Sequence, residues 1–155
     1  MPSSSIVTAI ATTVALLLSA STAHAQEGQL PPIVTKGMAV FQSQGVEAGV
    51  RALTPNWSNP EDQDKQQQLV DAFKRIEPST GALAGYDLVR LLEISPHYAR
   101  AYIIMLFENM PTFLVLTLYT APGKEALVTS FTFNTEASKA FPPVLLEPQA
   151  VMPRK

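Results

Sequence analysis

The fold of this chain is constrained most by four strand-like segments that are joined through connections of hairpin length. The four segments comprise residues 86–94, 98–108, 112–121 and 126–134. The connections consist of turn-forming residues, namely Ser95-Pro96, Asn109-Met110-Pro111 and Pro122-Gly123-Lys124. Connections this short require antiparallel neighbours, because a parallel crossover is much longer. The sequence therefore predicts a four-stranded antiparallel meander.

A helical pattern precedes the predicted sheet. Apolar residues recur at helical spacing over 33–53. Gln44-Gly45 is expected to divide this stretch into two short helices, since Gly costs about 1 kcal/mol in a helix interior. A third helix is predicted to begin after Asn59, which can cap it, and to end at Glu77 before Pro78. The predicted fold class is therefore α+β, with three N-terminal helices packed on the four-stranded sheet.

The two middle strands are apolar on both faces over much of their length. In 98–108, alternation places Tyr98, Arg100 and Tyr102 on one face, and Ala101 and Ile103 on the other. The next strand alternates in the same way. An antiparallel sheet with one face in water alternates apolar with polar residues, which these strands do not do. Both faces of the sheet are therefore expected to be covered.

The three helices can cover one face only, so the second face needs another cover. A second copy of the same sheet is the simplest candidate, and we expect a homodimer packed through the sheet face. The alternative is that the Pro-rich tail folds back over this face with Val144-Leu145-Leu146.

Residues 1–25 are predicted to form a cleavable signal peptide. An uncharged apolar run over 6–18 is followed by Ala23-His24-Ala25, an A-x-A cleavage site before Gln26. The run is shorter than the roughly 20 residues that a membrane-spanning helix needs. We therefore expect cleavage between Ala25 and Gln26 and no membrane attachment afterwards. The chain has no cysteine, so disulfides are excluded, and an exported protein without them indicates a bacterial periplasm or secretion.

After the predicted signal peptide, the sequence is expected to divide into a mobile entry segment, one domain and a tail. The entry segment is 26–32, the α+β domain is 33–141, and the Pro-rich tail is 142–155. A domain of this size can build a single core. Acidic and basic residues nearly balance and form no basic stripe, so we expect no nucleic-acid partner.

The order of these elements resembles the NTF2-like (SnoaL-like, cystatin-like) superfamily, in particular its small exported bacterial proteins. The resemblance is carried by short segments spread over the predicted domain, at 37–41, 56–57, 107–113, 116–119 and 131–134. It implies an α+β cone, in which the helices pack on a curved four-stranded antiparallel sheet. Members of this superfamily include isomerases, hydrolases, dehydratases, transport adaptors and ligand-free scaffolds, so the fold does not fix a function.

The sequence offers little for nucleophilic or metal chemistry. His97 is the only histidine outside the leader, lies in a predicted turn, and has no G-x-S-x-G motif to pair with. One histidine and no cysteine are too few ligands for a zinc site. No metal and no other cofactor are therefore expected, and no catalytic residue is assigned.

An enzymatic interpretation would place a carboxylate and a tyrosine in the pocket of the cone, as the resemblance to isomerase-like members implies. The sequence offers three carboxylates and three tyrosines for this role: Asp87, Glu93 and Glu108, with Tyr86, Tyr98 and Tyr102. The catalysis would be of the general acid–base type.

A ligand-binding interpretation uses two arginines and one tryptophan. Alternation places Arg90 on the face of Tyr86, and Arg100 on the face of Tyr98 and Tyr102, where the arginines could bind an anion. In the plainer alternative, both arginines lie at a solvated rim of the sheet. Trp57 is expected either to pack across the open end of the cone or to form the lid of a pocket. The candidate ligand-binding residues are Trp57, Tyr86, Arg90, Tyr98, Arg100 and Tyr102.

These observations favour an exported NTF2-like module that is not an enzyme and that binds a small ligand or a protein partner. One alternative is the pocket enzyme described above. The other is a module that binds peptides at an open edge of its sheet.

Overall fold

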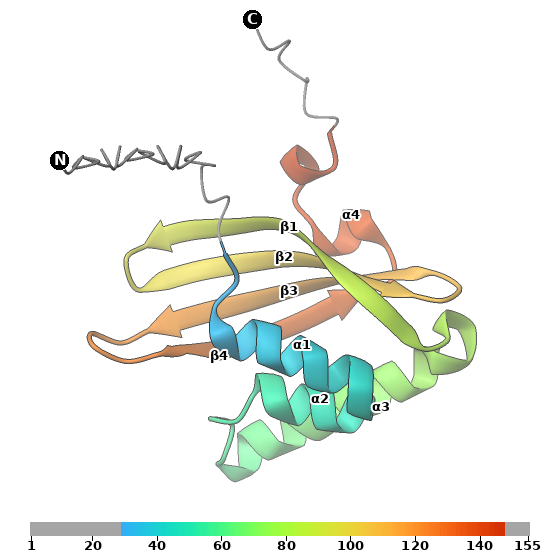
Figure 1. The fold of residues 1–155 in the computed structure, drawn as a ribbon, viewed down its shortest axis with the longest axis horizontal. Helices are drawn as coiled ribbons and strands as arrows, with labels where there is room; N and C mark the ends of the chain where they lie inside the picture. Colours follow the sequence, from blue (N-terminus) through green and yellow to red (C-terminus); the bar gives the residue numbers. More distant parts are fainter. Residues whose placement is uncertain (1–28, 148–155) are drawn as a thin grey trace, which may run out of the picture.

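The computed structural model describes residues 29–147, which form an α+β fold (Figure 1). The predicted combination of helices with a four-stranded antiparallel sheet is confirmed, and the strands follow one another in the order β1-β2-β3-β4. The predicted signal peptide lies outside the described residues, as does the tail beyond Glu147.

The helices α1, α2 and α3 precede the sheet and lie together on one side of it (Figure 1). They span Pro32–Gln44, Val46–Leu53 and Pro60–Thr80. Gly45, with φ of 85°, separates α1 from α2. At the start of α3, the Asn59 side chain accepts a hydrogen bond of 2.8 Å from the Asp62 amide. Leu30, in the entry segment that we expected to be mobile, is buried in the core.

The expected end of α3 at Glu77 was wrong, because the helix continues through Pro78 to Thr80. Pro78 removes only its own N–H from the helix, and the bond from the Gly81 amide to Glu77 O is still formed after it. The helix stops at Gly81, whose φ of 78° favours glycine and whose amide donates to Glu77 O at 2.9 Å.

The strands are β1 (Leu83–Ser95), β2 (Tyr98–Phe107), β3 (Pro111–Thr120) and β4 (Ala126–Asn134). We call the face towards α1–α3 the inner face. It carries the buried residues Ala101, Ile103 and Met105 of β2, Leu114, Leu116 and Leu118 of β3, and Val128 and Phe131 of β4. We call the opposite face, with Arg100, Tyr102 and Val115, the outer face.

Tyr86 and Arg90 do not share a face, which corrects the prediction from alternation. Tyr86 pairs with Met105 of the inner face, whereas Arg90 pairs with Tyr102 of the outer face. The register shifts between Leu88 and Arg90, so Val89 is an extra residue of β1. A bulge of this kind reverses the alternation up to the next register shift, which lies between Glu93 and Ser95.

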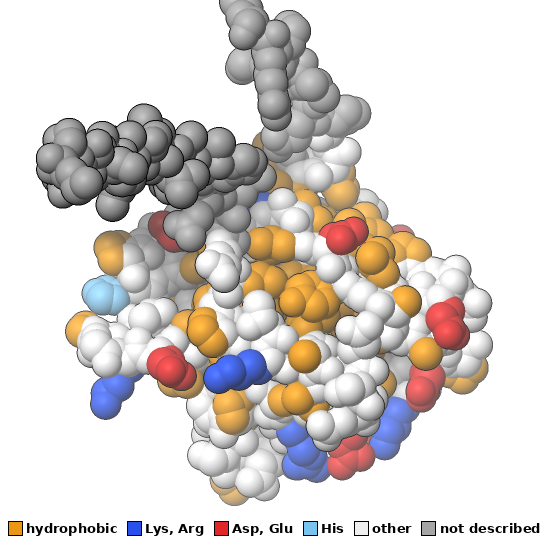
Figure 2. All heavy atoms as spheres, in the orientation of Figure 1, with side chains coloured by type: hydrophobic (Ala, Val, Ile, Leu, Met, Phe, Trp, Pro, Cys, Tyr) orange, Lys and Arg blue, Asp and Glu red, His pale blue; other side chains and the backbone are white. Residues whose placement is uncertain are grey.

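The inner face is sealed by aromatic and aliphatic side chains from the helices. Phe73 of α3 lies at the centre, with its ring stacked on that of Phe133 at a centroid distance of 3.8 Å. It also contacts Phe41 at 5.2 Å and Phe131 at 6.1 Å. Ring pairs of this kind add to the energy of burial. Figure 2 shows hydrophobic side chains in the middle of the visible face, with many of the charged side chains around the helices.

The helices α1 and α2 pack at very short range through two glycines. A Cβ atom on Gly49 would collide with the side chain of Phe41, and one on Gly37 would collide with that of Leu53. Both glycines are buried. The close approach of the two helices therefore depends on the absence of side chains at these positions.

The outer face is partly covered by the segment that follows β4. This segment contains α4 (Ala137–Ala140) and the 3-10 helix η1 (Pro143–Leu145), and α4 lies on the side of the sheet opposite α1–α3 (Figure 1). Phe141 is buried here, with its ring edge-on to Tyr102 at 5.5 Å and to Phe113 at 5.4 Å. Phe141 therefore provides the main contact, whereas Val144 and Leu146 remain exposed.

Candidate binding surfaces

The uncovered part of the outer face presents aromatic and aliphatic side chains to solvent. One row across the sheet pairs Tyr98 with Tyr119, and Tyr119 with Leu127. The neighbouring row pairs Leu92 with Arg100. Leu92, Tyr98 and Tyr119 each retain about 40% of their accessible surface, at the end of the sheet where β1 turns into β2. We call Leu92, Tyr98, Arg100, Tyr119 and Leu127 the open patch.

A hollow of about 500 Å³ lies between the open patch and the segment after β4. Its floor includes Arg100 and the hydroxyl side chains of Thr117, Ser130 and Thr132, and its wall includes Lys139 and Phe141. Lys139 pairs with Glu136 at 2.6 Å, whereas Arg100 forms no ion pair with any described residue. This outer hollow therefore combines one unpaired cation with several hydroxyl groups.

The structure brings four of the six predicted ligand-binding residues to the outer face. These are Arg90, Tyr98, Arg100 and Tyr102, although Tyr102 is buried beneath Phe141. Tyr86 is separated from them on the inner face. Trp57 lies beside α3 and β4, away from this group.

Trp57 is held by a hydrogen bond to β4, which is an edge strand of the sheet. Its indole Nε1 donates a hydrogen bond of 3.0 Å to Val128 O, and Asn56 Nδ2 lies 3.4 Å from the same oxygen. The ring packs against the core and also lines two hollows, of about 530 Å³ and about 550 Å³. Trp57 therefore packs against the core and, at the same time, can contact a ligand in a surface hollow.

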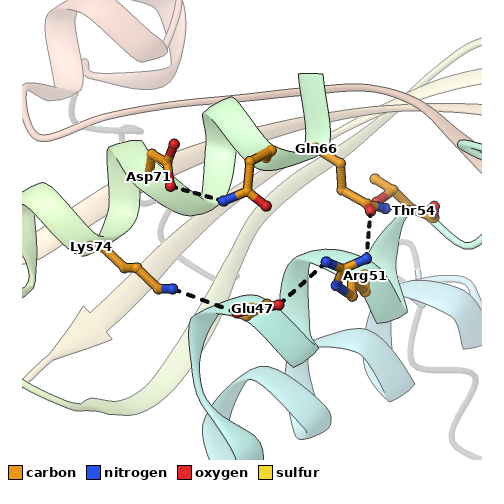
Figure 3. A network of polar contacts seen from close by, with 7 residues as sticks. Glu47, Arg51, Thr54, Gln66, Asp71 and Lys74 are labelled. Carbon is orange, nitrogen blue, oxygen red and sulfur yellow. Dashed lines mark hydrogen bonds and ion pairs between the residues drawn. The ribbon is translucent and has the colours of Figure 1, made fainter. Parts of the chain in front are cut away.

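A polar network connects α2 with α3 next to Trp57 (Figure 3). Gln66 is buried, and its Nε2 donates to Thr54 Oγ1 at 2.8 Å and to Thr54 O at 3.2 Å. Arg51 reaches Gln66 Oε1 at 3.5 Å and Glu47 at 3.3 Å, and Lys74 reaches Glu47 at 3.5 Å. Sequence reasoning missed this network because its residues follow no motif. The sequence signal that could have located it is the spacing of Gln66, which lies four residues before Val70 and seven before Phe73 and therefore on the apolar side of α3.

Among the described residues, the carboxylates considered for acid–base chemistry share no surface hollow with a tyrosine. Glu108 accepts a hydrogen bond from the Ala82 amide at 3.2 Å and so links the α3–β1 connection to the β2–β3 turn. Asp87 and Glu93 are exposed on β1. None of the four hollows described at the surface is lined by both a carboxylate and a tyrosine.

His97 is part of the hairpin connection between β1 and β2. Its Nδ1 lies 2.9 Å from Thr120 O, and its backbone oxygen accepts from the Thr120 amide at 2.9 Å. The ring therefore ties the end of β3 to this turn. Within residues 29–147, no group of three or more acidic or histidine side chains is placed to hold a metal ion.

No helix within residues 29–147 is long and apolar enough to cross a membrane. No protein-family model matches the sequence, and no characterised protein or solved structure matches it closely enough to carry an argument. The functional assignment therefore rests on the chemistry and geometry of the described residues.

Proposed function

We propose that this protein is an exported NTF2-like module without catalytic function, which binds a protein partner through the open patch. The first partner is a second copy of the same chain. The observation that carries this proposal is the contrast between the two faces of the sheet. Side chains fill the inner face, where an NTF2-like cone would hold a ligand, whereas the open patch leaves apolar and aromatic groups in water.

The composition of the open patch suits a protein interface. Tyrosine and arginine are enriched in the centres of such interfaces, where they combine a large contact area with hydrogen bonding. In a two-fold dimer, each residue of the patch meets the same patch of its partner. Arg100 of one subunit could then stack on Tyr98 or Tyr119 of the other, which would compensate for the burial of its charge.

Solution mass tests the dimer. We expect the mature protein, beginning at Gln26, to have twice its chain mass by native mass spectrometry and by light scattering at micromolar concentration. The double variant Leu92→Lys/Tyr119→Lys should be a monomer with an unchanged circular dichroism spectrum. Gln68→Lys adds a charge on the exposed surface of α3 and should leave the mass of the dimer unchanged. A wild-type monomer over the whole concentration range would contradict the proposal.

A small anion bound in the outer hollow is the second candidate function. Arg100 is the unpaired cation of this hollow, and the hydroxyl groups of Thr117 and Ser130 can donate hydrogen bonds beside it. Citrate should then raise the unfolding temperature of the wild type, and Arg100→Gln should abolish the shift. If sodium chloride of equal ionic strength has the same effect, the anion site is wrong.

A further inference from the structure

The first hollow beside Trp57 is lined mainly by uncharged side chains, and most of these are polar. Its volume of about 530 Å³ lies within the range of about 300–1,000 Å³ that is usual for ligand sites. Besides Trp57, its lining includes three glutamines and two hydroxyl side chains: Gln63, Gln66, Gln67, Thr54 and Ser58. This composition differs from that of the core and from that of the open patch. We infer that this hollow binds a neutral oligosaccharide.

The amide groups of the hollow are held in place and still have free acceptors. Gln63 Nε2 donates to Ser58 O at 3.0 Å, and Gln67 Nε2 donates to Asp71 Oδ1 at 2.9 Å. Among the described residues, none donates to the Oε1 atom of Gln63 or Gln67. Each of these oxygens can therefore accept a hydrogen bond from a sugar hydroxyl group.

Beneath these exposed amides, Gln66 provides a rigid base. It is buried and bonded on both sides, to Thr54 through Nε2 and to Arg51 through Oε1. A fixed polar base limits the side-chain entropy that is lost when a ligand binds. The site is therefore largely preorganised.

Trp57 supplies the apolar wall that sugar rings require. One side of a pyranose ring carries several C–H groups, which pack on the flat face of an indole ring. The hydrogen bond from Trp57 Nε1 to Val128 O at 3.0 Å fixes the orientation of this ring. Trp57 is half-buried and lines the hollow, so it is the aromatic group that a sugar ring would meet there.

The charges of the hollow favour a neutral ligand. Its lining includes no carboxylate, and its single cation, Arg51, is paired with Glu47 at 3.3 Å. An anionic ligand would have to compete with Glu47 for this guanidinium group. A neutral oligosaccharide needs no such exchange.

Titration with sugars tests the inference, and the chain reports on it directly because Trp57 is its only tryptophan. Maltohexaose, cellohexaose and chitohexaose are added separately to the mature protein while the Trp57 fluorescence is recorded. We expect at least one of them to give a saturable change. Gln63→Ala/Gln67→Ala should weaken its binding about tenfold, since each lost hydrogen bond contributes modestly.

Gln68→Ala is the matched control, because Gln68 is an exposed glutamine of the same helix that lines the other hollow. It should bind the sugar like the wild type, and both variants should keep the unfolding midpoint of the wild type. No fluorescence change with any of the three sugars at about 10 mM, a concentration that detects even weak binding, would overturn the inference. Saturable binding of a glutamine-rich peptide in place of the sugars would also overturn it. The dimer measured by solution mass is independent of these outcomes.

Discussion

The two faces of this sheet have similar apolar content but very different surroundings. On the inner face, Ile103 and Leu114 have no accessible surface, because α1–α3 cover them. On the outer face of the same two strands, Tyr98 and Tyr119 retain about 40%. In these two regular strands, alternation along the sequence determines which side chains share a face, whereas the rest of the chain determines whether that face is sealed.

The largest effect is expected from the centre of the sealed face. Phe73→Ala removes a ring that contacts three other rings, and should lower the free energy of unfolding by about 3–5 kcal/mol. Urea unfolding followed by circular dichroism measures this loss. A loss below about 1 kcal/mol would show that the inner face can repack, and the contrast between the faces would be weaker than the structure indicates.

A smaller loss is expected where α1 and α2 approach each other over the inner face. Gly49→Ala places a methyl group against Phe41 and should cost about 2–3 kcal/mol through overpacking. Gly85→Ala is the control on β1, where nothing lies within 4 Å of an added Cβ atom. This variant should be as stable as the wild type in the same urea titration. Equal losses in both variants would indicate a general effect of glycine replacement instead of close packing.

The outer face should respond less to the loss of its own aromatic residue. Phe141→Ala uncovers Tyr102 and should cost about 1.5 kcal/mol, at the lower end for a buried phenylalanine, because water can refill the outer hollow. Val144→Ala, in the exposed part of the same segment, should have little effect. If Phe141→Ala costs as much as Phe73→Ala, the segment after β4 is as important for the fold as the helices.

The sequence predicted the parts of the fold that depend on local signals. Hairpin turns, the break at Gly45 and the Asn59 cap are all written in a few neighbouring residues, and the structure contains each of them. The α+β class and the antiparallel sheet followed from these signals. The bulge at Val89 has no comparable signal, because it depends on how β1 pairs with β2, and so Tyr86 and Arg90 were wrongly assigned to one face.

The candidate sites were less predictable because they form between distant segments. Trp57 was singled out from the sequence, but its hydrogen bond to Val128 O joins residues that are 71 positions apart. Phe141 covers Tyr102 only because the chain reverses after β4. Alternation along a strand identifies neither contact, since each one requires the path of the whole chain.

The exposed ion pairs in the first turns of α3 belong to neither face of the sheet and provide the smallest expected effect. Lys65 lies 2.9 Å from Glu61 and 3.7 Å from Asp62. The hydrogen bond from Lys65, followed by the attraction of its charge, lowers the pKa of Glu61, and the same bond raises the pKa of Lys65. Lys65→Met should therefore return the pKa of Glu61 towards its ordinary value, which an NMR titration of the side-chain carboxyl group would measure.

The same pair fixes the sign of a pH dependence. Because the pKa of Glu61 is lowered on folding, its contribution to stability is present above the ordinary pKa of a glutamate and is lost as the pH falls through the lowered value. The raised pKa of Lys65 gives a contribution that is present below the ordinary lysine pKa and is lost as the pH rises through the raised value. Both groups are exposed, so solvent screens the pair, and wild type and Lys65→Met should have the same unfolding midpoint at neutral pH within error. A clear loss of stability in Lys65→Met would show that these exposed ion pairs stabilise the fold, although they belong to neither face of the sheet.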